Sequence, residues 1–220
     1  MQDALLNMLP AAIGVAISPI PIVAVILMLM SNRAAVNGVA FLVGWILALG
    51  AVGVIVLNIG ITSGDSVNTA AEWGKLAIGA LFLLMAASNW RKRPKPGQKP
   101  AMPKWMQAID RVKWPVAFGL AILLAGLNPK NLGLALAGVA SIAEANLPTN
   151  DQYILLAIFI GISSLSLLLP LLFFFVGGKR AKALLLKLKA WLARYNTIIV
   201  AIILLILGVK IAFQAVLELF

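Results

Sequence analysis

The sequence contains neither cysteine nor histidine. Their absence excludes disulfides, thiol redox chemistry and metal sites built from thiolate or imidazole ligands. Acidic residues are also scarce, with seven in 220 residues, and none lies in the core of a long apolar segment. Proton-coupled carriers usually relay protons through a membrane-embedded carboxylate or histidine, so proton coupling by that route is not expected. No cofactor is expected either.

Apolar residues, in contrast, dominate the chain. The sequence is 62% hydrophobic and 11% charged, with a mean hydropathy of +1.03. A soluble domain of this length cannot bury so much apolar surface, so we predict an all-α, polytopic membrane protein. Since a membrane-spanning helix takes roughly 20 residues, the apolar runs predict six transmembrane helices, at about 4–30, 35–58, 73–90, 116–142, 153–176 and 197–217.

Basic residues alternate between the predicted connections. Fifteen of the 18 lie in three of them, namely at Arg33 and in the segments 91–115 and 177–196. The segments 59–72 and 143–152 are acidic and contain no basic residue. The positive-inside rule therefore places the basic connections in the cytoplasm and both termini outside. Basic loops of this kind favour contact with anionic membrane lipids over binding of nucleic acid, which is not expected.

A proline- and lysine-rich segment divides the chain into two similar parts. It covers residues 91–115 and is predicted to be a cytoplasmic linker between a first three-helix repeat, 1–90, and a second, 116–220. Because three is an odd number, the two repeats must have opposite orientations, which predicts an inverted repeat. Within the second repeat, 181–194 has leucines on one face and lysines on its flanks, which predicts an amphipathic helix at the membrane interface.

Proline interrupts the first and fourth predicted spans. Proline removes a backbone donor, so each helix should break there. Irregular backbone at membrane depth must be buried in protein or line a cavity, and a pair of breaks in corresponding positions points to a transporter's binding site. The residues of the two breaks are the predicted substrate site: Ser18, Pro19, Pro21, Asn128, Pro129, Lys130 and Asn131.

Several of these residues have a specific chemical role in the prediction. Ser18 and Asn128 each precede a proline, as N-cap residues do, and the half-helices that they start present free amides to an anion. Lys130 lies near the middle of a span, where a lysine costs roughly 3 kcal/mol on insertion scales. It is interpreted either as the cation that attracts an anionic head group or as a cap on the carbonyl end of 116–127.

Other polar residues in the spans are weaker candidates. Ser163, Ser164 and Ser166 form a short patch that could line a pathway, although serines in spans often only bond their own helix. A pair formed by Ser18 and Lys130 is the only enzymatic constellation available, since the chain offers no catalytic triad, acid pair or phosphate loop. We therefore do not predict an enzyme.

The two broken motifs also resemble those of a known family. Ser18-Pro19-Ile20-Pro21 and Asn128-Pro129-Lys130 resemble elements of the lysine-exporter (LysE) superfamily. Within it, AISPIPIVAVILML (16–29) and LNPKNL (127–132) look most like the GAP family, the peptidoglycolipid- and sulfolipid-addressing proteins of actinobacteria. Amino-acid exporters of the superfamily have Pro-Gly-Pro where this chain has Ile20 in place of the glycine.

The resemblance implies a multi-pass protein of the bacterial inner (plasma) membrane that exports a cell-envelope glycolipid or an anionic amphipathic precursor. The expected mechanism is alternating access at a midplane site between the broken helices. Two alternatives remain: an exporter of amino acids or other small metabolites, and a non-transporting scaffold for envelope-lipid export machinery. The expected partners are the lipid or glycolipid substrate, a second copy of the chain, or other components of envelope-lipid transport.

Overall fold

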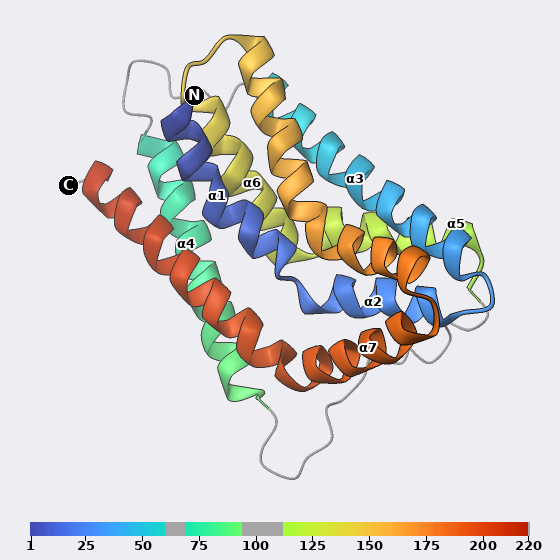
Figure 1. The fold of residues 1–220 in the computed structure, drawn as a ribbon. Helices are drawn as coiled ribbons and strands as arrows, with labels where there is room; N and C mark the ends of the chain where they lie inside the picture. Colours follow the sequence, from blue (N-terminus) through green and yellow to red (C-terminus); the bar gives the residue numbers. More distant parts are fainter. Residues whose placement is uncertain (60–68, 94–111, 220) are drawn as a thin grey trace.

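The computed structural model describes residues 1–59, 69–93 and 112–219, and within them the chain forms helices and no strand (Figure 1). Most of the predicted linker 91–115 lies outside the described residues. The helices follow one another in this order: α1 (Gln2–Ala16), α2 (Pro19–Met30), α3 (Ala34–Ile59), α4 (Thr69–Arg91), α5 (Trp114–Ile122), the π-helix η2 (Leu123–Leu127), α6 (Pro129–Ala143) and α7 (Thr149–Leu219).

Both predicted breaks are present. α1 and α2 are separated by Ile17 and Ser18 and bend by 49° relative to each other. The helix formed by α5 and η2 bends by 61° relative to α6 at Asn128. In each case a proline occupies the first position of the second half-helix, where its missing N–H and fixed φ are tolerated. The prolines thus end one helix and begin the next.

Three helical stretches are long and apolar enough to cross a membrane: Ala34–Ile59, Thr149–Gly178 and Ala183–Leu217. The number rises to five if each bent pair is one span. The remaining predicted span, 73–90, coincides with α4, whose apolar stretch Leu76–Arg91 is shorter than a full span. A membrane protein is therefore supported, while the count of six spans stays a prediction.

α7 reverses direction at Gly178, which has φ 53° and ψ −133°. A side chain would strain this conformation, so glycine allows the chain to fold back within one residue. The apolar stretch after the turn, Ala183–Leu217, has 35 residues. At 1.5 Å per residue it is roughly 50 Å long, which exceeds the 30 Å hydrocarbon core. This excess length leaves room for the basic segment 181–194 at the interface, as the sequence predicts.

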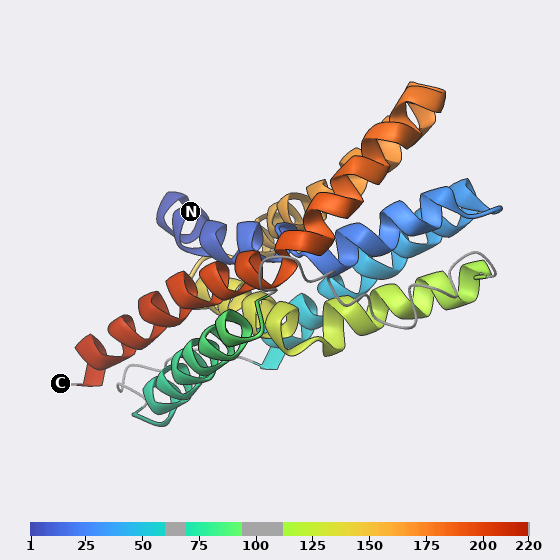
Figure 2. The ribbon, with the colours of Figure 1, turned by 90° about the horizontal axis from the view of Figure 1, so that it is seen from below.

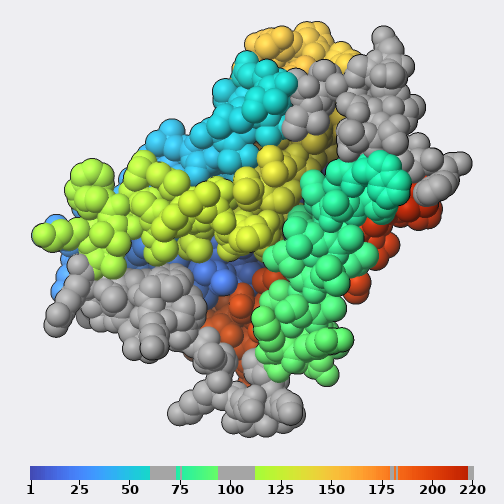
Figure 3. All heavy atoms as spheres, turned by 180° about the vertical axis from the view of Figure 1, so that it is seen from behind, coloured from blue at the N-terminus to red at the C-terminus, as the bar shows by residue number. Residues whose placement is uncertain are grey.

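The half-helices of the two broken pairs cross near the centre of the molecule. α1 packs against α6 and α7, α3 packs against α5, and α4 packs against α7. Figure 2 shows both chain termini at one end of the molecule, with the α2–α3 turn and the turn at Gly178 at the other end. α5 and α6 follow one another across the face seen in Figure 3. Because both termini lie at the same end, the arrangement agrees with an even number of membrane-spanning segments. The inverted repeat remains a prediction.

Candidate functional site

The two helix breaks, more than 100 residues apart in sequence, meet inside the fold. The Ser18 hydroxyl donates a hydrogen bond to Asn131 Oδ1 at 3.1 Å. Ser18, Lys130 and Asn131 are all buried, as are Pro19 and Pro21, while Asn128 is half-buried and Pro129 is exposed. The structure therefore brings the predicted site residues of both halves into one region.

Lys130 satisfies a backbone carbonyl that the first break leaves open. In a continuous helix, Gly14 O would accept a hydrogen bond from the amide of residue 18, but the helix ends before that residue. Lys130 Nζ donates to Gly14 O at 2.9 Å instead. Of the two interpretations of Lys130, the one in which it caps the carbonyl end of 116–127 is thus wrong, because its amino group bonds Gly14 O in the other half of the molecule.

Asn131 satisfies a carbonyl at the second break. Residues 123–127 form a π-helix, in which Leu124 O would accept from residue 129. That residue is Pro129, which has no N–H. Asn131 Nδ2 donates to Leu124 O at 2.8 Å, and Asn131 Oδ1 accepts from Ser18. One amide side chain therefore ends the first half-helix of its own span and ties it to the other span.

The two predicted N-caps behave differently. Asn128 Oδ1 accepts from the amide of Lys130 at 3.0 Å, which confirms it as the cap of α6. Ser18 occupies the N-cap position of α2 but makes no capping hydrogen bond with its side chain. Its hydroxyl points to Asn131, so the capping prediction for Ser18 is wrong. It also follows that Ser18 and Lys130 do not form a nucleophile–base pair, since each bonds another group.

The three serines of the predicted pathway are only partly connected to the breaks. Ser163 is buried, and its hydroxyl lies 3.5 Å from Ala12 O, near the end of α1. Ser164 is buried next to it, and its Oγ has no hydrogen-bond partner among the described residues. Ser166 is half-buried.

A cavity of about 620 Å³ opens between α1, α4, α6 and α7. Leu207 is one of its lining residues, and Leu207 Cδ1 is only 3.1 Å from where a Cβ on Gly14 would stand. The lining of the cavity thus comes close to Gly14, whose carbonyl accepts from Lys130. Its wall is largely apolar but carries a set of polar side chains at the end nearer the termini: Asp3, Asn7, Ser141, Glu144, Lys210 and Gln214.

These cavity residues were not predicted as site residues. A signal for them exists in the sequence, because Asp3 and Asn7 are four residues apart, as are Lys210 and Gln214, and such pairs share one helix face. What the sequence does not contain is the packing that brings α1 and the end of α7 together around one space.

The arrangement around Lys130 contains groups that can bind an anion. Lys130 stands in the first turn of α6, where the helix dipole adds partial positive charge. Among the described residues its amino group has one acceptor, Gly14 O, and an ammonium group has three donors. The described residues contain no group of three or more His, Cys, Asp or Glu side chains that could hold a metal ion.

Comparison with known proteins places the chain in a family. No curated protein and no solved structure matches it. One family model, that of Sap, the sulfolipid-1-addressing protein, matches residues 8–216. The match covers both breaks and nearly all of the helices, and it agrees with the resemblance of the two proline motifs. The chain therefore belongs to the sulfolipid-1-addressing protein family.

Proposed function

We propose that this protein exports an anionic, amphipathic envelope lipid, or a precursor of one, by alternating access at the crossing of its two broken helices. The family name associates its members with the addressing of a sulfolipid, whose head group is an anion. The single observation that carries the proposal is the buried Lys130, which bonds Gly14 O across the two halves beside a partly polar cavity.

The cavity suits a cargo with two kinds of surface. Its volume of about 620 Å³ falls within the range of small-molecule sites, roughly 300–1,000 Å³. The apolar walls of α1, α6 and α7 fit the hydrocarbon of the cargo. Leu207, which lines the cavity, lies beside Gly14, so the head group would reach the crossing where Lys130 bonds Gly14 O. A fully hydrophilic solute such as an amino acid would leave those apolar walls unmatched.

The positive charge of Lys130 has a functional part in the proposal, beyond its structural hydrogen bond. Lys130→Gln tests this, because glutamine retains a donor for Gly14 O and removes the charge. In proteoliposomes loaded with a fluorescent, sulfated glycolipid, we expect transbilayer movement by Lys130→Gln to fall at least tenfold, the effect of roughly 1.4 kcal/mol of lost interaction. Lys187→Gln, on the exposed surface of α7, should keep the wild-type rate.

The two variants separate the proposal from its alternatives. Normal movement of the sulfated lipid by Lys130→Gln would remove the anion-binding role of the lysine. No movement by any variant, the wild type included, would favour the scaffold function. Thermal unfolding in detergent checks that Lys130→Gln is folded, so that a loss of transport can be assigned to the charge.

A further inference from the structure

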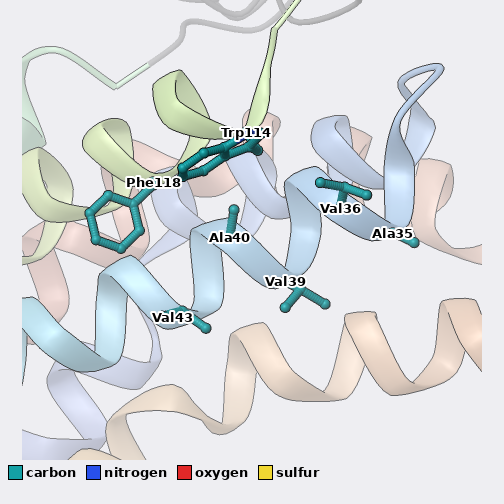
Figure 4. Close-up of a pocket in the computed structure, with 7 residues that line it drawn as sticks. All are labelled: Ala35, Val36, Val39, Ala40, Val43, Trp114 and Phe118. Carbon is teal, nitrogen blue, oxygen red and sulfur yellow. The ribbon is translucent and has the colours of Figure 1, made fainter.

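A second surface feature, a groove between α3 and α5, lies outside the site described above. Its volume is about 550 Å³, and Val36, Val39, Ala40 and Val43 of α3 line it together with Trp114 and Phe118 of α5. Figure 4 shows the two aromatic rings on the α5 side and the small side chains along α3. The lining is apolar throughout, so the groove fits a hydrocarbon chain and not a polar solute.

The groove is closed at one end and open at the other. A Cβ on Gly44 would lie 2.6 Å from Phe118 O, so α3 and α5 touch there and the groove cannot continue. Toward the start of both helices the groove is lined by the exposed side chains of Val36 and Trp114. The lining residues of α3 run from Ala35 to Val43, over which a helix rises roughly 12 Å. The groove is therefore somewhat shorter than one leaflet, which is about half of a 30 Å hydrocarbon core.

The open end of the groove carries positive charge. Arg33 precedes α3 and Lys113 precedes α5, and both are exposed. The two chain segments are held together, because Asn37 Nδ2 donates to Val112 O at 2.8 Å and to Ser31 Oγ at 3.2 Å. Arg33 O in turn accepts from the amide of Asn37. A basic pair thus flanks the mouth of an apolar groove, at the end that the charge distribution predicts to be cytoplasmic.

We propose that this groove binds one acyl chain of an anionic membrane lipid, with the lipid head group at Arg33 and Lys113. The apolar groove matches the tail of such a lipid, and the two basic residues beside the groove match its phosphate. Basic residues at the membrane surface attract anionic head groups, while the valines and the two aromatic rings contact the tail. The site is separate from the helix breaks and does not depend on transport.

The absence of native cysteine allows a direct test of the tail position. Val39→Cys is labelled with a thiol-reactive photo-crosslinker in nanodiscs of phosphatidylcholine containing a minor share of phosphatidylglycerol, and the adducts are identified by intact-mass spectrometry. We expect phosphatidylglycerol to be enriched in the adducts roughly tenfold over its share of the bilayer. Leu84→Cys, on the exposed face of α4, should crosslink lipids in proportion to their abundance.

Two further variants in the Val39→Cys background identify what holds the lipid. Arg33→Gln combined with Lys113→Gln should remove the enrichment, whereas Lys187→Gln combined with Arg194→Gln, which also removes two exposed charges of α7, should preserve it. Ala40→Leu fills the groove and should reduce all lipid adducts. Equal enrichment at Val39→Cys and Leu84→Cys would overturn the proposal. Crosslinking of Val39→Cys to a second protein chain would overturn it in favour of an interface between copies.

Discussion

The Asn131 side chain connects two groups, Leu124 O and the Ser18 hydroxyl, that would otherwise lack partners in a buried region. It donates to Leu124 O, accepts from Ser18, and is itself fully buried. A buried carbonyl left unpaired costs roughly 1–3 kcal/mol. The Asn131 amide therefore contributes to the stability of the crossing, together with the bond from Lys130 to Gly14 O.

Asn131→Leu should therefore destabilise the protein by about 2–4 kcal/mol, because it leaves both Leu124 O and the Ser18 hydroxyl unpaired. Unfolding by sodium dodecyl sulfate in mixed micelles measures the change. Asn58→Leu is the matched control: Asn58 is exposed and bonds Val54 O of its own helix and the Tyr153 hydroxyl, so we expect a change below about 1 kcal/mol. An equal effect of the two substitutions would contradict the assigned role of Asn131.

The Ser18–Asn131 bond can be measured separately by a double-mutant cycle of Ser18→Ala and Asn131→Leu. We expect a coupling free energy of roughly 0.5–1.5 kcal/mol, the usual range for one hydrogen bond. If the free-energy changes of the two substitutions were strictly additive, the Ser18–Asn131 bond would make no contribution to stability.

At the scale of the helices, α6 packs closely against α1 and α7 at Gly138. A Cβ on Gly138 would overlap the Phe159 ring of α7 and lie 3.1 Å from Ala11 Cβ of α1. Three helices thus converge on one glycine, and any side chain there must push one of them away. Helix interfaces in membranes depend on small residues for this reason.

We expect Gly138→Ala to destabilise the fold by about 1–3 kcal/mol through overpacking. Gly161→Ala on α7 is the matched control, since a Cβ there meets nothing within 4 Å. Alanine is the better helix former, so Gly161→Ala should be neutral or slightly stabilising. Thermal unfolding of the two variants in the same detergent compares them, and similar unfolding temperatures would rule out tight packing at Gly138.

The sequence predicted the helix breaks well, because proline acts locally on the residues next to it. Ser18, Asn128, Lys130 and Asn131 were all singled out as polar residues in apolar runs, and the structure brings the two breaks together through the Ser18–Asn131 bond. Their partners were not predictable. Lys130 bonds Gly14 O and Ser18 bonds Asn131, and such pairings depend on how two distant helices pack. The π-helix at 123–127 also leaves no simple periodic signal.

At the scale of the whole molecule, the charged connections between the described helices α2, α3, α6 and α7 lie at two opposite ends. Both termini lie at one end, and the turns at 31–33 and Gly178 lie at the other (Figures 1 and 2). The basic connections at Arg33 and 177–196 are thus separated from the acidic connection 143–152. This separation is what an insertion governed by the positive-inside rule produces.

The predicted orientation can be tested with single cysteines on this cysteine-free chain. Asn150→Cys, at the start of α7, should react with a membrane-impermeant maleimide added to intact cells. Asn32→Cys, between α2 and α3, should react only after the membrane is permeabilised. Both positions are exposed, so accessibility reports the side of the membrane. The reverse pattern would invert the topology and place the mouth of the α3–α5 groove in the outer leaflet.

The bond between Lys130 and Gly14 O has a consequence for how a bound anion and a moving helix would influence each other. The amino group has a limited number of donors, so an anion that draws it away from Gly14 O weakens one of the ties between the two halves of the chain. By thermodynamic reciprocity, a conformation in which that tie is already broken binds the anion more tightly. In this way the lysine would link occupancy to rearrangement with no titrating carboxylate, and the cargo itself would supply the free energy that loosens the crossing.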